Sequence, residues 1–173
     1  MVTEDGRLVE VRLPAWDERV AASAERAAAG AGAAGNDPGV SPAARSSAGT
    51  GSDGAGWAAQ LEAYFRGERR DWAPDEVDLE ALEVPAFHRD VYRALLHVRA
   101  GATVSYGGLA VMAGRPQAAR AVGTAMARNP IAIVVPCHRV VRFDGRLGHY
   151  GFGDGWKAWL LRLEAAGGWK PVG

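Results

Sequence analysis

The chain of 173 residues has 20 Lys and Arg, 20 Asp and Glu, and 48% hydrophobic residues, a composition typical of a globular protein with a sizeable core. No stretch approaches the roughly 18 apolar residues of a membrane span, and the acidic N-terminal segment lacks the cationic start and apolar core of a signal peptide. One cysteine excludes an intrachain disulfide, and the cysteine and four histidines show no paired zinc-site spacing. We therefore expect a cytoplasmic protein with a reduced thiol, no metal and no contact with a membrane.

The net charge of zero conceals an uneven distribution along the sequence. Residues 1–84 hold 8 Lys and Arg against 16 Asp and Glu, whereas residues 85–173 hold 12 against 4. Such an asymmetry is typical of an acidic module joined to one that faces a polyanion. We therefore place a boundary at Pro85, between an N-terminal domain at 1–84 and a C-terminal domain at 85–173.

The N-terminal half alternates between patterned and low-complexity segments. Residues 8–13 are mostly apolar with two charged interruptions and predict a strand. Residues 21–56 are dominated by Ala, Gly, Ser and Asp, and we interpret them as a flexible low-complexity insertion because they offer almost no large side chain to bury. The spacing of apolar residues over 57–65 predicts a helix that ends at Gly67, and an acidic connector follows at 71–83.

Helical patterns dominate the C-terminal half. Apolar side chains recur at helical spacing over 87–98. Ser105 is a suitable N-cap for a helix at 106–113, and Pro116 precedes a second helix at 117–126. Two short helices joined by a Gly-containing turn make a helix-turn-helix candidate.

The second of these helices is built from unusually small side chains. This pattern alone favours a tightly packed internal helix, but Arg120 stands among alanines with nothing local to pair with. Small neighbours would let a nucleic-acid backbone come close to such a helix. The pattern therefore leaves both an internal helix and a nucleic-acid interface open.

The single cysteine lies in the sequence VVPCHRVV, after an apolar run at 131–135 that predicts a buried strand. Most free cysteines are small buried hydrophobes, and His138 is then a structural histidine of the core. Pro136 ends the predicted strand directly before Cys137. Neighbouring cations lower the pKa of a thiol. Adjacent side chains of a strand point to opposite faces, so a Cys-His pair needs a turn or a bridging water. The position indicates a nucleophile without naming its electrophile.

Several separately spaced segments between residues 85 and 164 agree with one known family. They are Ser105-Tyr106, Arg120-Ala121-Val122-Gly123, Asn129-Pro130, Pro136-Cys137-His138-Arg139-Val140-Val141, and Trp159-Leu160-Leu161 followed by Glu164. This set resembles the O6-alkylguanine-DNA alkyltransferases, also called methylated-DNA-protein-cysteine methyltransferases. The resemblance implies an α+β fold. It has a small N-terminal α/β domain, here expected to lack the first strand of its hairpin, and a mostly helical C-terminal domain with a winged-helix-like helix-turn-helix.

The resemblance also implies an irreversible, single-turnover DNA repair reaction that needs no cofactor. Cys137 would attack the alkyl carbon of O6-alkylguanine, or of O4-alkylthymine, and keep the alkyl group as a thioether. His138 would deprotonate the thiol through a water, with Glu164 orienting the imidazole. Tyr106 would donate a hydrogen bond or proton to the departing guanine, and Asn129 would shape the turn before the acceptor.

The implied partner is double-stranded DNA that carries the alkylated base, bound by a monomer. Arg120 would fill the place of the flipped nucleotide, because the base must leave the duplex to reach the thiol. The other implied DNA contacts are Ala119, Ala121, Gly123, Thr124 and Tyr106. The implied base pocket is formed by Val140, Tyr150, Gly151 and Phe152. A phenyl ring at residue 152 predicts poor reaction with large alkyl groups, unless the ring packs against Trp156 on the surface instead.

Two interpretations from other classes stay open. A cysteine-dependent hydrolase would share the Cys-His-acid set, but it needs an oxyanion hole and turns over repeatedly. A non-catalytic helix-turn-helix lesion-binding protein would bind DNA without taking the alkyl group. The presence of Cys137 argues against the second interpretation.

Overall fold

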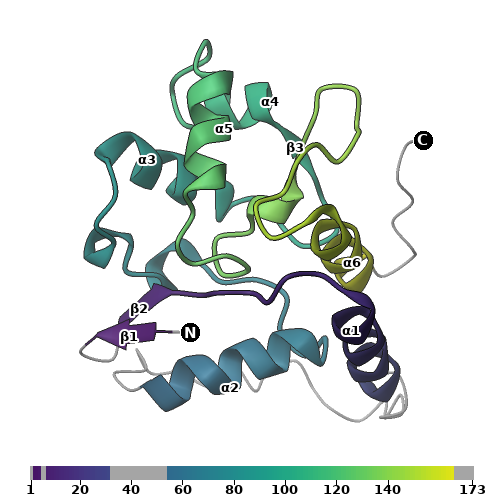
Figure 1. The fold of residues 1–173 in the computed structure, drawn as a ribbon. Coiled ribbons are helices and arrows are strands. Elements are labelled where there is room, and N and C mark those ends of the chain that lie inside the picture. The colour runs from purple at the N-terminus through teal and green to yellow at the C-terminus, as the bar shows by residue number, and fades with distance from the viewer. Residues whose placement is uncertain (1, 5–6, 32–53, 166–173) are drawn as a thin grey trace, which may run out of the picture.

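The computed structural model describes residues 2–4, 7–31 and 54–165, where helices predominate and the strands are short (Figure 1). In chain order the elements are β1 (Val2–Glu4), β2 (Arg7–Glu10), α1 (Glu18–Ala31), α2 (Gly54–Phe65), the 3-10 helices η1 (Pro74–Glu76) and η2 (Leu79–Ala81), α3 (Ala86–Leu95), β3 (Val104–Ser105), α4 (Tyr106–Met112), α5 (Ala119–Ala127), the 3-10 helix η3 (Cys137–Arg139), β4 (Val140–Val141) and α6 (Asp154–Glu164). The β1–β2 pair is antiparallel and the β3–β4 pair is parallel, so the fold is of the α+β class. No helix within the described ranges is long and apolar enough to cross a membrane.

Strands β1 and β2 form an antiparallel pair, in which Thr3 pairs with Leu8. This corrects the expectation of a strand without its first partner, and the second strand is shorter than predicted, at Arg7–Glu10. The chain leaves the hairpin at Val11, whose N–H donates to the carbonyl of Pro130 at 2.7 Å. The hairpin thus leads directly to the segment that precedes the cysteine.

Both ends of the predicted flexible insertion are helical. Helix α1 covers Glu18–Ala31 and α2 begins at Gly54, while 32–53 lie outside the described residues. Alanine has the highest helix propensity, and Asp17 caps α1 by accepting a hydrogen bond from the N–H of Val20 at 2.8 Å. The lack of large apolar side chains suggested an irregular segment, but a helix rich in alanine needs few of them.

The acidic connector contributes to the core as well as linking the two halves of the sequence. Its buried side chains are Trp72, Val77, Leu79 and Leu82. They belong to one hydrophobic cluster that also includes residues of β2, α2, α3, α5 and α6. The segments on both sides of Pro85 therefore share a core.

Helices α3, α4 and α5 pack against one another in the C-terminal half (Figure 1). The predicted N-cap of α4 forms, because the hydroxyl of Ser105 accepts a hydrogen bond from the N–H of Gly108 at 3.0 Å. Helix α5 begins at Ala119, two residues later than predicted. Its C-terminal part is tied to α3, since the hydroxyl of Tyr92 donates to the carbonyl of Ala125 at 2.8 Å.

The apolar segment 131–135 is buried as predicted, but it is not a strand. It forms isolated bridges around a turn, with Ile133 at a φ of 76°. A positive φ is unfavourable for a β-branched residue, so the surrounding packing must hold this conformation. The turn redirects the chain, and Cys137 consequently begins a 3-10 helix.

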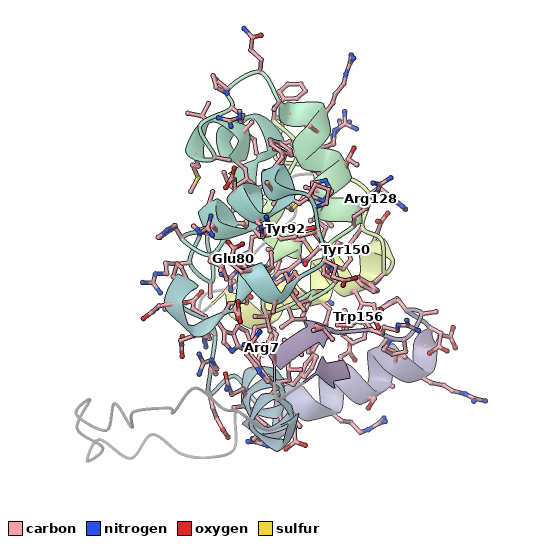
Figure 2. All side chains as sticks on the ribbon, turned by 90° about the vertical axis from the view of Figure 1, so that its left-hand side faces the viewer. Arg7, Glu80, Tyr92, Arg128, Tyr150 and Trp156 are labelled. Atoms are coloured by element: carbon pink, nitrogen blue, oxygen red, sulfur yellow. The ribbon has the colours of Figure 1, made fainter. Side chains whose placement is uncertain are left out.

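Trp156, in the first turn of α6, anchors the N-terminal segment. Its indole N–H donates to the carbonyl of Pro14 at 2.8 Å, and its ring meets Trp16 edge-on with the centroids 5.0 Å apart. In Figure 2 the labelled Trp156 lies beside the purple ribbon of this segment. Helix α6 is thereby held by both halves of the sequence.

We expect Gly153→Ala to lower the free energy of unfolding by about 1 to 3 kcal/mol, because Gly153 precedes α6 at a φ of 100°, where L-residues are strained. A Cβ there would lie 3.5 Å from the Cβ of Trp16, an ordinary contact, so the cost is one of backbone conformation. Urea denaturation measures it. Gly151→Ala is the matched control, since its φ is not positive and its new Cβ meets nothing within 4 Å. Equal losses for the two variants would contradict this account.

Candidate active site around Cys137

Cys137 lies at a pocket between the helices of the C-terminal half and the loop that precedes α6. The thiol-bearing residue is 4% exposed, and the pocket has a volume of about 400 Å³. This volume lies in the range of small-molecule sites. The lining residues come from α4, α5, η3 and the segment between β4 and α6: Tyr106, Gly123, Met126, Ala127, Cys137, Arg142, Gly148, His149, Tyr150 and Gly151.

The environment of the Cys137 thiol favours its protonated form. Burial raises the pKa of the thiol, while hydrogen bonds with Asn129 and Tyr150 and the charge of Lys157 act in the opposite direction. The thiol donates to the hydroxyl oxygen of Tyr150 at 3.7 Å. A thiol is a weak nucleophile compared with its thiolate, so this site needs a base.

His138 has the properties of that base. It is fully buried, and its Nε2 lies 2.8 Å from Oε1 of Glu164. A carboxylate only accepts hydrogen bonds, so Nε2 carries the proton and Nδ1 is the acceptor nitrogen. Nδ1 is buried without a protein partner. Burial lowers the pKa of His138, with Glu164 opposing the shift, and the imidazole is neutral at neutral pH.

Arg139 holds Glu164 in place through two hydrogen bonds. Its Nε donates to Oε2 at 2.9 Å and its Nη2 to Oε1 at 2.7 Å, a bidentate pair with both side chains at most 2% exposed. Although burial opposes ionisation, the contacts with His138 and Arg139 hold the pKa of Glu164 well below its usual range. The guanidinium also donates to Asp71 at 2.8 Å, and this contact joins the site to the N-terminal half.

The structural roles of Arg139 and Lys157 do not follow from sequence patterns. Lys157 is 1% exposed and donates to the carbonyls of Val140 and Leu147. Burial lowers the pKa of Lys157 to about 8, with the charges of Cys137 and Asp154 opposing the shift. The sequence signal that could have indicated a structural role for Lys157 is its position as a single Lys among the aromatic and apolar residues of α6, because charged side chains are rarely buried without partners.

Several of the predicted site residues meet at the pocket. Tyr106, Gly123, Tyr150 and Gly151 line it together with Cys137. The hydroxyl of Tyr106 stays protonated, because burial raises the pKa of this half-buried side chain, and so does a negative charge on Cys137.

Asn129 braces the turn that leads to the cysteine. Its Nδ2 donates to the carbonyl of Val135 at 2.8 Å, and its Oδ1 accepts from the N–H of Ile131 at 3.2 Å. Asn129 thus connects the end of α5 with the segment that carries Cys137.

The other predicted DNA-contact residues lie earlier in the chain, on α5. Arg120, Ala121 and Thr124 are exposed, and Ala119 is half-buried.

Two of the predicted pocket residues lie elsewhere in the structure. Val140 is fully buried in β4, where it pairs with Val104 of β3. Phe152 is half-buried, and its ring meets that of Tyr150 edge-on with centroids 5.6 Å apart. Neither residue lines the pocket. Phe152 therefore packs on a residue of the pocket wall without lining the pocket itself, and the expectation that its ring excludes large alkyl groups stays a prediction.

A buried thiol, next in sequence to a neutral histidine that contacts an ionised glutamate, is an arrangement in which a cysteine can act as a base-assisted nucleophile. Comparison with known proteins specifies the class. The family described as 6-O-methylguanine DNA methyltransferase, DNA binding domain, matches residues 86–166. The chain belongs to the O6-methylguanine-DNA methyltransferase family.

Individual relatives agree with this assignment. The mouse methylated-DNA-protein-cysteine methyltransferase is 47% identical over 121 residues, which cover 66% of this chain and 56% of the mouse protein. The crystal structure of Mycobacterium tuberculosis O6-methylguanine methyltransferase has a TM-score of 0.58 at 44% identity, with 70% of each chain covered. That of Mycobacterium tuberculosis OGT in complex with DNA has a TM-score of 0.57 at 47% identity, covering 62% of this chain and 63% of that one. The match thus spans little more than half the length of the mouse relative.

We expect Glu164→Gln to lower the free energy of unfolding at pH 7 by about 3 to 5 kcal/mol, because it leaves the buried Arg139 with only the partly exposed Asp71 as a counter-charge. The folded-state pKa of Glu164 lies below the unfolded value of about 4.3, so its contribution to stability is present above that pH and is lost as the pH falls below it. Urea denaturation at pH 7 and pH 3 is the measurement, because the loss grows as the pH falls from the unfolded-state pKa towards the folded-state pKa, and the variant should lose less stability on acidification than the wild type.

Glu80→Gln provides the control for this prediction. Glu80 pairs with Arg89 and Arg93, but its side chain is 67% exposed. An exposed pair contributes at most about 1 kcal/mol. A similar loss for both variants, or the same acid dependence in Glu164→Gln as in the wild type, would contradict the role given to the buried pair.

Proposed function

We propose that this protein repairs DNA by direct reversal, transferring a methyl or other alkyl group from O6-alkylguanine, and from O4-alkylthymine, to Cys137. The observation that carries the proposal is the position of Cys137 at a pocket, next to a neutral His138 whose Nδ1 has no protein partner. The names and the DNA complex of the relatives support the same substrate class. The reaction requires no cofactor, because the protein itself supplies the nucleophile and the base.

The proposed transfer is an in-line displacement at the alkyl carbon. The thiol of Cys137 passes its proton through a water to Nδ1 of His138, and a sulfur–carbon bond forms as the carbon–O6 bond breaks. Glu164 stabilises the imidazolium that results, since it already faces Nε2 at 2.8 Å. The product is a thioether, which does not revert, so each protein molecule acts once.

The electron pair of the broken bond remains on the purine, and Tyr106 is the group proposed to neutralise it. Tyr106 lines the pocket with Cys137 and keeps its hydroxyl proton at neutral pH. Donation of a hydrogen bond or a proton to the departing guanine makes it a better leaving group. Tyr150 and Gly151 complete the wall of the pocket around the base.

We further propose that α4 and α5 act as a helix-turn-helix on double-stranded DNA, within a winged-helix-like C-terminal domain at 85–173. Helix α5 presents Ala119, Ala121, Gly123 and Thr124, small side chains that let it enter the minor groove. Arg128 is exposed directly after α5 (Figure 2) and adds positive charge next in sequence to the pocket residue Ala127. The acidic half at 1–84 supports the active site through the contact of Asp71 with Arg139. The protein acts as a cytoplasmic monomer in this proposal.

Arg120 is the residue proposed to occupy the space left by the extruded nucleotide. It lies on α5, is exposed, and belongs to the same helix as the pocket residue Gly123. The alkylated base cannot reach Cys137 inside an intact duplex, because a 4% exposed thiol at a pocket requires the base to leave the stack.

The first experiment on this proposal is mass spectrometry after incubation with a duplex that contains O6-methylguanine. We expect one methyl group per protein molecule, carried by Cys137. Cys137→Ser should abolish transfer while leaving DNA binding intact, because the acceptor sulfur is lost and α5 is unchanged. Repeated product formation per molecule would indicate a hydrolase instead, and binding without methylation would indicate a lesion-binding protein.

A second experiment tests base extrusion. Arg120→Ala should slow transfer from duplex DNA at least about ten-fold, because filling the vacated stack offsets an unstacking cost of a few kcal/mol. Transfer from the free base O6-methylguanine should change little, and DNA affinity of the wild type should fall as salt rises. Arg93→Ala is the control, since Arg93 is exposed on α3 and pairs with Glu80 and Asp90. Equal slowing on both substrates would give Arg120 a structural role.

A further inference from the structure

A residue of the N-terminal half contacts the acid of the active site directly. The hydroxyl of Tyr64, on α2, donates a hydrogen bond to Oε1 of Glu164 at 2.7 Å, although the two residues are 100 positions apart in the sequence. The same oxygen accepts from Nε2 of His138 at 2.8 Å and from Nη2 of Arg139 at 2.7 Å. The Tyr64 hydroxyl is also 3.5 Å from Nε2 of His138. Tyr64 is 1% exposed, so its hydroxyl lies out of contact with bulk solvent.

The choice of acceptor distinguishes Tyr64 from a tyrosine that is merely packed in the core. A buried hydroxyl needs a partner, and a main-chain carbonyl suffices, as Tyr92 shows with Ala125. Tyr64 instead donates to the one carboxylate oxygen that faces the imidazole. Burial, reinforced by the charge of Glu164, raises the pKa of Tyr64 well above its usual value, so the hydroxyl is a permanent donor.

We propose that Tyr64 is a positioning residue that acts through Glu164 to set the proton affinity of His138 during transfer to Cys137. The inference rests on the proposed function, in which His138 is the base. The hydroxyl holds Oε1 at the imidazole and takes up part of the negative charge of the carboxylate. It therefore bonds more strongly to Glu164 when His138 is neutral than when His138 is an imidazolium. Tyr64 thus favours the neutral imidazole that can accept the proton of the thiol.

The Tyr64→Phe variant leaves the other charged and titratable groups around His138 unchanged in the sequence. They come from every element packed on the site: Asp71 from the segment after α2, Cys137 and Arg139 from η3, and Lys157 and Glu164 from α6. Tyr64→Phe deletes one oxygen and keeps the ring that packs against Phe65 and Trp72. A change in the titration of His138 in this variant therefore reports on the hydroxyl.

The test is the pH dependence of single-turnover methyl transfer from an O6-methylguanine duplex between about pH 4 and 8, because the lowered pKa of His138 places the acid limb in the lower part of this range. In the wild type the rate should fall at low pH as His138 becomes protonated. In Tyr64→Phe we expect this acid limb to move to higher pH by about 0.5, because the unshared carboxylate attracts an imidazolium more strongly. Site-specific 3-fluorotyrosine at position 64 strengthens the donor without removing it and should move the limb in the opposite direction.

Trp72→Phe is the matched control. Trp72 is buried next to Tyr64, and its indole donates to Gln60 at 2.8 Å, but none of its hydrogen bonds reaches Glu164. It should lower stability without moving the acid limb. An unchanged limb in Tyr64→Phe, or the same displacement in Trp72→Phe, would overturn the inference and leave Tyr64 a structural residue.

A second measurement separates this inference from the proposed function. The pKa of His138 is followed by NMR titration of its imidazole nitrogens in the free protein, without DNA, with the signals assigned against His138→Gln. A higher value in Tyr64→Phe than in the wild type supports the coupling, and equal values overturn it. Absence of methyl transfer in the wild type would refute the proposed function alone, since the titration does not depend on the reaction.

Discussion

The ion pair between Arg139 and Glu164 lies out of water, with side-chain exposures of 2% and 1%. Removing two charges from water costs several kcal/mol per ion, and only close partners offset that cost. Glu164 therefore has Tyr64 and His138 as further donors, and Arg139 has Asp71 as a second carboxylate. The orientation of the base follows from these contacts, because the imidazole is held by the same oxygen that the guanidinium holds.

Polar contacts of this pair join the two halves of the sequence in addition to their common hydrophobic core. Arg139 and Glu164 belong to the half that carries the thiol, whereas Tyr64 and Asp71 belong to the acidic half. The main chain contributes too, since the carbonyl of Arg70 accepts from Nη2 of Arg139 at 2.8 Å. The acidic residues of 1–84 thus include Asp71, a carboxylate that contacts the buried guanidinium of Arg139.

Local signals in the sequence predicted the elements whose geometry depends on neighbours along the chain. The capping hydroxyl of Ser105 is one such case, and the resemblance around Cys137 placed the acceptor in a site with His138 and Glu164. Contacts between residues far apart in the sequence could not be predicted in this way, because nothing in the pattern of α2 indicates that Tyr64 contacts Glu164. The segment 131–135 was predicted as a strand because burial and apolar composition do not distinguish a strand from a buried turn. Phe152 could not be placed because flanking glycines allow many backbone directions.

The burial of Cys137 has a consequence for the chemistry that the protein avoids. Oxidants and stray electrophiles in solution react with exposed thiolates, whereas this sulfur is 4% exposed and its pKa is raised by burial. If Cys137 is the single acceptor of the proposed reaction, the protein loses that activity permanently when the thiol is oxidised beyond repair or alkylated by the wrong molecule. The low reactivity of the buried thiol therefore protects the protein before it meets the substrate of the proposed reaction.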